Sequence, residues 1–146
     1  MTEPGGTIRI LLVEDSPADV SLTTEVLAEA RVANDVAVVG DGDAALAYLR
    51  REGPYAGVPR PDLVLLDLNL PRRNGQEVLA EMKADEALRA IPVVVLTTSA
   101  RDADVRAAYE HQAAGFVTKP VVLEDFLRAV AAIESFWLRA VRYPER

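Results

Sequence analysis

The chain has 146 residues, of which 50% are hydrophobic and 27% are charged, a composition typical of one globular domain rather than of a disordered protein. Its net charge of −7 argues against a general nucleic-acid binder, and the absence of cysteine excludes disulfides, thiol catalysis and thiolate metal sites. The longest apolar runs fall far short of the roughly 20 residues that span a bilayer, so we expect a cytoplasmic protein that does not enter a membrane.

Residues 1–7 lack the features of a secretory signal, and we expect them to form a disordered lead-in. The apolar run at 8–13 predicts a central strand that is covered on both faces. Ser16, Pro17 and Asp19 then indicate a helix start, with Ser16 as N-cap, Pro17 at the first helical position and Asp19 completing a capping box. A helix should therefore begin directly after the acidic pair that ends the first strand.

Strand and helix signals alternate along the rest of the chain. The prolines and glycine of 52–61 exclude regular structure there and predict a surface loop. The other expected elements are strands at 35–39, 62–67, 93–96 and 115–118, and helices after 43, after 75, at 101–112 and from 123 to about 141. We therefore predict one doubly wound α/β domain at 8–133, with a five-stranded parallel sheet and five helices, followed by a helical extension and tail at 134–146.

Four of the apolar strands end in chemically active side chains. Glu14 and Asp15 follow the first strand, Asp67 ends the third, Thr97 ends the fourth and Lys119 follows the fifth. In a doubly wound sheet the ligand site lies beyond the carboxyl ends of the strands, where the strand order reverses. We therefore expect these endings to meet around Asp67.

Three carboxylates that meet at one sheet edge repel one another unless a cation neutralises them. Mg²⁺ suits an open site of this kind, because it binds one or two carboxylates together with waters and phosphate oxygens. Lys119 adds a positive charge and Thr97 adds a hydroxyl donor. These are the parts needed for phosphoryl transfer to a carboxylate, with Asp67 as nucleophile and Asp15 as the principal metal ligand.

The combination of these motifs resembles the receiver domain of response regulators in two-component signalling, over nearly the whole chain. The matching segments are Leu12-Val-Glu14-Asp15-Ser-Pro, Leu65-Leu-Asp67-Leu-Asn69-Leu-Pro71, Leu96-Thr97-Thr98-Ser99 and Phe116-Val-Thr118-Lys119-Pro120. The resemblance implies the strand order 2-1-3-4-5 and a cis bond between Lys119 and Pro120. It also implies these roles: Asp67 as phospho-acceptor, Glu14 and Asp15 as metal-binding pair, Asn69 as a metal ligand through its backbone carbonyl, Lys119 as the site lysine, Thr97 as switch hydroxyl and Phe116 as switch aromatic.

A protein of this family is a signalling switch that catalyses its own phosphorylation and dephosphorylation, rather than an enzyme that turns over a separate substrate. The resemblance implies a sensor histidine kinase as partner. It also implies that phosphorylation draws in Thr97, lets Phe116 rotate and alters the surface of the fourth helix, fifth strand and last helix. Because the chain ends soon after its last predicted helix, we expect output through protein docking rather than DNA binding.

Three features resemble the stand-alone regulators that pair with bacterial phytochromes. They are the tail residues Phe136, Trp137 and Leu138, the run at 97–99 and the proline-rich insertion at 52–61. Regulators of this type tend to form homodimers through the face that contains the last helix, so we expect a bacteriophytochrome as partner and the tail in a dimer interface. The alternative for the tail is an apolar cap on the domain.

Other interpretations of the same residues remain open. A phosphorylation-independent receiver-like module would share every motif, whereas a haloacid dehalogenase-type phosphatase requires a second aspartate where this chain has Asn69. A flavin-binding domain requires a glycine-rich loop after the first strand, where this chain has acids. Arg72 and Arg73 either steer an acidic partner or are simply solvated, and His111 is expected on the surface of its helix.

Overall fold

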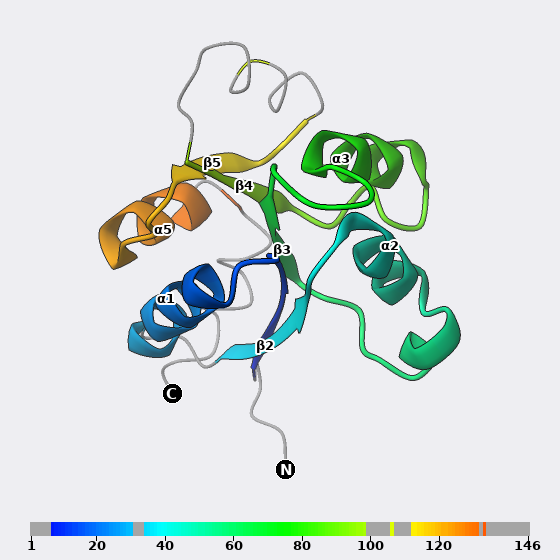
Figure 1. Cartoon of the computed structure of the whole chain (residues 1–146), viewed down its shortest axis with the longest axis horizontal. Helices are drawn as coiled ribbons and strands as arrows, with labels where there is room; N and C mark the ends of the chain where they lie inside the picture. The colour runs from blue at the N-terminus through cyan, green and yellow to red at the C-terminus, as the bar shows by residue number, and fades with distance from the viewer. Residues whose placement is uncertain (1–6, 31–33, 99–105, 107–111, 132, 134–146) are drawn as a thin grey trace.

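The computed structural model describes residues 7–30, 34–98, 106, 112–131 and 133, and in these it contains five strands, four α-helices and one 3-10 turn (Figure 1). The five strands alternate with the helices along the chain, as the sequence predicts. The elements are β1 (Ile8–Val13), α1 (Pro17–Glu29), β2 (Asn34–Val39), α2 (Gly42–Arg50), a 3-10 turn (Gly53–Tyr55), β3 (Leu63–Asp67), α3 (Gly75–Ala84), β4 (Val93–Thr97), β5 (Gly115–Thr118) and α5 (Leu123–Ala131).

All strand pairs are parallel and the strand order is β2-β1-β3-β4-β5, which confirms the predicted doubly wound sheet. The order reverses between β1 and β3, which are neighbours although β2 lies between them in the chain. The register aligns the carboxyl ends: Asp67 is opposite Leu96, and Thr97 is opposite Thr118. The side chains that follow β1, β3, β4 and β5 are therefore delivered to one edge of the sheet.

The sheet separates two hydrophobic layers. Helices α1 and α5 cover one face and helices α2 and α3 cover the other (Figure 1). Leu63 and Leu65 of β3 pack in the layer under α1 and α5, whereas Val64 and Leu66 pack in the layer under α2 and α3. All five residues of β3 are buried, because a central parallel strand has no solvent-facing side. This burial on both faces fixes the position of Asp67 at the end of the strand.

Side chains cap the N-termini of α1 and α3, one helix on each face of the sheet. Ser16 caps α1 by accepting a hydrogen bond from the Asp19 N–H at 3.3 Å, and Pro17 occupies the first turn, as predicted. The predicted capping box at α1 is wrong, because the backbone N–H of Ser16 donates to Glu14 Oε2 at 3.2 Å instead of to Asp19. A complete capping box is present at α3, between Asn74 and Glu77.

The segment at 52–61 is not entirely irregular, which corrects the sequence-based expectation of a loop without secondary structure. Gly53–Tyr55 form one 3-10 turn, closed by a hydrogen bond from the Ala56 N–H to the Gly53 carbonyl at 3.2 Å. Pro54 is compatible with this turn because the first residues of a helix do not use their N–H groups. Gly53 enters it with φ of 59°, in the left-handed region that glycine tolerates.

The last helix is shorter than predicted. It ends at Ala131, and Ile133 is outside the helix with its N–H donating to the Val130 carbonyl at 3.0 Å. This turn still buries the Ile133 side chain, which is why helical spacing alone did not reveal the helix end. The described α5 has nine residues and α1 has 13, and the predicted continuation at 134–141 lies outside the described residues, so the prediction that the last helix is the longest stays untested.

Several predicted segments lie outside the described residues: the lead-in at 1–6, nearly all of the expected helix at 101–112 with His111, and the tail with Phe136, Trp137 and Leu138. Their predictions stay untested. Within the described part of the chain, no helix has the length and apolarity needed to cross a bilayer.

Candidate functional site: an acidic cluster around a buried lysine

Three carboxylates come together at the carboxyl edge of the sheet. Glu14 and Asp15 follow β1, Asp67 ends β3, and one carboxylate oxygen of each lies within 4.8 Å of the others. Glu14 and Asp67 are buried, each with a relative exposure of 2%, whereas Asp15 is exposed. The cluster is therefore open to solvent on the Asp15 side and closed by protein on the other.

Lys119 brings a positive charge into this cluster from the end of β5. Its Nζ lies 2.8 Å from Glu14 Oε1, 3.0 Å from Asp19 Oδ2 and 3.3 Å from Asp67 Oδ2. The Lys119 backbone N–H donates to the Thr97 carbonyl at 2.7 Å, which extends the pairing of β4 with β5 by one residue. The Lys119–Pro120 bond is cis, as the sequence resemblance implies.

The electrostatics of the cluster follow from burial and proximity. Burial alone would lower the pKa of Lys119, but its hydrogen bonds to Glu14 and Asp19 and the nearby charge of Asp67 raise the pKa well above its usual value. Burial, together with the charge of Asp67, raises the pKa of Glu14 despite the hydrogen bond from Lys119. Lys119 is therefore held in the charged form, and one ammonium compensates only part of the acidic charge around it.

Asp19 belongs to this site although sequence reasoning assigned it only to helix capping. It lies in the first turn of α1, and its contact with Lys119 spans 100 residues of sequence. The only signal for it in the sequence is its place one turn after the acidic pair. The same Ser-x-x-Asp pattern before a helix also predicts a capping box, so it does not by itself distinguish the two roles.

Asn69 and Thr97 occupy the positions predicted for them next to Asp67. The Asn69 N–H donates to Asp67 Oδ1 at 3.1 Å, so this carboxylate is fixed by a backbone donor on one oxygen and by Lys119 on the other. Thr97 ends β4, the strand next to Asp67, and its side chain is buried with a relative exposure of 1%. Both residues thus lie within the neighbourhood of the cluster.

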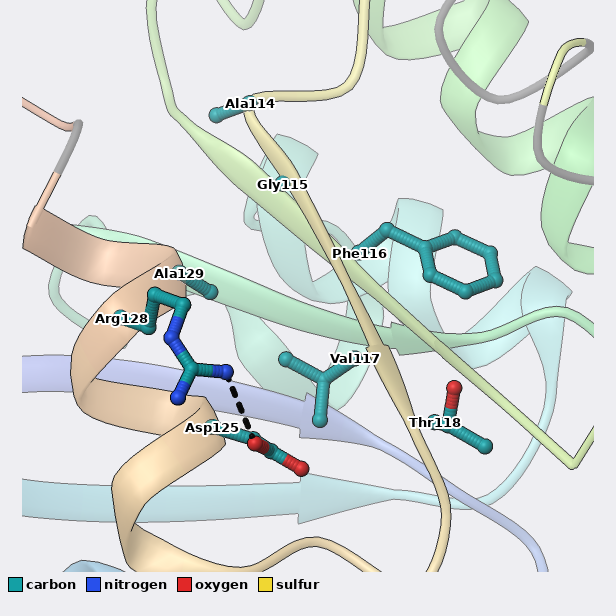
Figure 2. A pocket seen from close by; sticks show the side chains of 8 residues that line it. All are labelled: Ala114, Gly115, Phe116, Val117, Thr118, Asp125, Arg128 and Ala129. Atoms are coloured by element: carbon teal, nitrogen blue, oxygen red, sulfur yellow. Dashed lines mark hydrogen bonds and ion pairs between the residues drawn. The ribbon is translucent and has the colours of Figure 1, made fainter. Parts of the chain in front are cut away.

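Phe116 lies on the same face of the sheet as Thr97. Figure 2 shows the Phe116 and Thr118 side chains on one side of β5 and Val117 on the other side, towards α5. Because Thr118 is opposite Thr97 in the register, Phe116 is a diagonal neighbour of Thr97 on that face. Phe116 is partly buried against the hydrophobic layer under α2 and α3. A movement of the Thr97 side chain would therefore change the packing around Phe116.

The turn after β3 is held against α2 by ion pairs. Arg72 Nε lies 3.4 Å from Asp41 Oδ2, Arg73 Nε lies 3.0 Å from Asp43 Oδ1, and Arg73 also pairs with Glu81. Both sequence-based interpretations of the two arginines are therefore incomplete, because the pair is neither simply solvated nor wholly available to an acidic partner. The signal for this was the acidic Asp41–Asp43 segment, whose proximity the sequence did not reveal.

The donor set fits a hard divalent cation. Three carboxylate oxygens within 4.8 Å of one another, with one acid exposed, match the oxygen ligands and the access to water that Mg²⁺ and Mn²⁺ prefer. The surplus negative charge that Lys119 leaves uncompensated also favours cation binding. Glu14, Asp15 and Asp67 are thus the residues that could hold such an ion.

Comparisons with known proteins agree with this geometry. Residues 10–131 match the family described as the response regulator receiver domain. The chain is 50% identical over 135 residues to the response regulator Rcp1 of Synechocystis sp., with 92% of each chain covered.

Two solved structures are similar to the whole fold. The phosphorylated cyanobacterial phytochrome response regulator RcpA has a TM-score of 0.78 and 46% identity, with 96% of this chain and 100% of that chain covered. The Mn²⁺-bound form of Rcp1 has a TM-score of 0.76 and 49% identity, with 94% and 99% covered. The family match spans most of the chain, and the curated relative is half identical over nearly its entire length. The resemblance inferred from the motifs is thereby confirmed, and the chain belongs to the response regulator receiver domain family of two-component signalling.

Proposed function

We propose that this protein accepts a phosphoryl group on Asp67 from a sensor histidine kinase, with Mg²⁺ bound by the acidic cluster, and signals through altered protein docking. The observation that carries the proposal is the placement of Asp67 Oδ2 3.3 Å from the Lys119 ammonium and beside two further carboxylates. This arrangement provides a nucleophile, a fixed positive charge and a cation site at one point of the sheet edge.

In the proposed reaction, a carboxylate oxygen of Asp67 attacks the phosphorus of a phosphohistidine. A P–O bond forms as the P–N bond breaks, and the electron pair of the broken bond stays on the histidine nitrogen. Lys119 compensates the charge of the phosphoryl oxygens, and the Asn69 N–H holds the carboxylate in a fixed orientation. The Thr97 hydroxyl acts as a donor to the bound phosphoryl group.

Mg²⁺ would be held by Glu14, Asp15, Asp67 and the backbone carbonyl of Asn69, and would neutralise the negative charge shared by the cluster and the incoming phosphate. Support comes from the spacing of the three carboxylates and from the similarity to Rcp1, whose solved structure is a Mn²⁺-bound form. Asp15, the exposed member, is the principal protein ligand in this proposal.

Phosphorylation would act on the output surface through Thr97 and Phe116. The Thr97 hydroxyl moves toward the phosphoryl oxygens, and Phe116 rotates into the space beside it. Phe116 also lines a surface pocket of about 420 Å³ between β5 and α5, together with Asp125 and Arg128 (Figure 2). The Phe116 side chain lies on the face of β5 away from α5, so its rotation would change the surface on that face, and we propose the pocket between β5 and α5 as a neighbouring part of the dimer or partner interface.

We further propose that the kinase is linked to a phytochrome, because the similar proteins include a phytochrome response regulator. We propose that the kinase docks on two exposed apolar side chains, Leu22 and Val122, which belong to the segments that carry Asp19 and Lys119. Leu22 lies one turn after Asp19 in α1, and Val122 follows Lys119 by three residues. Serine at both positions should reduce phosphotransfer from the kinase while leaving labelling by a small acyl phosphate unchanged.

The central test is incubation with Mg²⁺ and acetyl phosphate, followed by mass spectrometry of the intact protein. We expect one added phosphoryl group that is more stable in acid than in base, and none in Asp67→Asn. Asp85→Asn, which removes an aspartate charge after α3, is the matched control and should be labelled like the parent. Labelling that survives unchanged in Asp67→Asn would mean that the phosphoryl group is on another residue.

The proposed homodimer uses the helix predicted at 101–112, β5, α5 and the tail residues Phe136, Trp137 and Leu138. Trp137→Ala should weaken self-association in sedimentation experiments because it removes the largest apolar side chain of the tail. A variant that sediments like the parent would exclude the tail from the interface.

A further inference from the structure

We infer that Asp19 is a positioning residue for phosphoryl transfer, because it holds the Lys119 ammonium beside Asp67. The inference rests on the proposed phosphorylation of Asp67 and adds a residue from α1 to that site. The contact is direct, 3.0 Å from Asp19 Oδ2 to Lys119 Nζ, and the lysine side chain is 7% exposed.

The contacts of Lys119 match the donors of its ammonium group. A lysine ammonium has three N–H donors, and three carboxylates accept from or lie beside Nζ: Glu14 at 2.8 Å, Asp19 at 3.0 Å and Asp67 at 3.3 Å. The two shorter contacts are to the acids that do not accept the phosphoryl group. The position of the ammonium is therefore set mainly by Glu14 and Asp19, and the contact with Asp67 is the longest of the three.

Because Glu14 and Asp19 hold the ammonium, Lys119 can stay in place during phosphoryl transfer. When a P–O bond forms at Asp67, the carboxylate loses its charge and the phosphoryl oxygens become the acceptors on that side of Lys119. The ammonium can exchange its contact with Asp67 for a phosphoryl oxygen while Glu14 and Asp19 keep it in place. Without Asp19, Glu14 would be the only remaining anchor of the long, flexible Lys119 side chain. The loss of Asp19 should therefore lower the fraction of time in which Nζ faces the transferred group.

The local hydrogen bonding supports a role for Asp19 beyond the helix start. Glu14 Oε2 accepts the Ser16 N–H at 3.2 Å, which is the donor that a capping-box acid at position 19 would take. The Asp19 side chain points to Lys119 instead, with 29% of its surface exposed. Asp19 thus lies at the solvent side of the lysine, whereas Glu14, whose side chain is fully buried, lies on the inner side.

The test compares the rate of phosphorylation by acetyl phosphate and Mg²⁺ in Asp19→Ala, Asp19→Asn and the parent. We expect Asp19→Ala to lower the maximal rate about ten-fold, the factor expected for the loss of one charge-assisted hydrogen bond of modest strength. Asp19→Asn keeps an oxygen acceptor and should recover part of that rate. Glu25→Ala, which also removes an exposed carboxylate from α1, is the matched control and should react like the parent.

A double-mutant cycle separates positioning from a merely structural effect. If Asp19 acts through Lys119, Asp19→Ala should have no further effect on the rate in the Lys119→Met background. An equal slowing in both backgrounds, or an unchanged rate in Asp19→Ala, would overturn the inference. A parent protein that is not labelled at Asp67 would instead refute the proposed phosphorylation, so the two failures are distinguishable.

Discussion

Removing the charge of Asp67 should stabilise the protein when no divalent cation is bound. Asp67 lies within 4.8 Å of Glu14 and Asp15, and at an effective dielectric constant near 20 each repulsion costs about 3.5 kcal/mol. Its attraction to Lys119 at 3.3 Å contributes about 5 kcal/mol on the same scale. The net repulsion is about 2 kcal/mol, and solvent screening at the exposed Asp15 reduces it to about 1 kcal/mol.

The assay is thermal unfolding of Asp67→Asn in EDTA, with the parent alongside. Asparagine keeps an oxygen that can accept the Asn69 N–H, so the substitution changes charge more than geometry. For a chain of this length, about 1 kcal/mol corresponds to a rise in Tm of about 3 °C. Glu86→Gln is the matched control, because its side chain is 92% exposed and its removal changes the net charge equally.

Addition of Mg²⁺ should reverse the order of stability. The parent gains the binding free energy of the cation, about 2.7 kcal/mol at a concentration one hundred times the Kd, whereas Asp67→Asn has lost a ligand and gains less. A lower Tm of Asp67→Asn in EDTA would refute the reasoning, because it would mean that the attraction to Lys119 exceeds the repulsion among the acids.

The remaining predictions concern the turn after β3 and the charge of Glu14. Gly75→Ala should lower the Tm strongly, because its Cβ would lie 2.4 Å from the Asp67 carbonyl oxygen, whereas Gly57→Ala, with no atom within 4 Å of its Cβ, should not. Arg73→Ala should lower the urea midpoint more than Arg128→Ala, since Arg73 links the turn to α2 and α3, and equal shifts would contradict this role. Because burial raises the folded pKa of Glu14 above the usual value for glutamate, the contribution of Glu14 to stability is present at pH values below that usual pKa and is lost as pH rises through the folded pKa. In EDTA, Glu14→Gln should therefore gain stability relative to the parent as pH rises from 4 to 8, and parallel Tm curves would exclude this.

The sequence was sufficient for the architecture because each strand carries its own signal. The continuous apolar runs of β1, β3 and β4 indicate strands that are buried on both faces, and such strands occur in parallel sheets between helices. Parallel strands put all their carboxyl ends at the sheet edge where reactive residues follow, so the proximity of Glu14, Asp15, Asp67 and Lys119 could be predicted before any coordinates. Repeated local patterns and one rule of topology are enough for this part of the molecule.

Three contacts could be decided only by the tertiary structure. The sequence favoured a local partner for Asp19, the N–H three residues earlier, but a buried ammonium 100 residues away provides a stronger, charge-assisted contact. Arg72 and Arg73 could not be assigned because their acids, Asp41 and Asp43, come from a different strand–helix unit.

The ends of the short elements could not be predicted from the sequence either. The 3-10 turn at Gly53–Tyr55 and the end of α5 at Ala131 depend on a few hydrogen bonds between residues three apart. The apolar pattern does not distinguish such a turn from a loop or from a longer helix. The sequence by itself therefore determined which residues gather at the sheet edge, because local patterns repeat along the chain. The folded chain decided which of their charges pair, because pair formation depends on distances between segments that are remote in sequence.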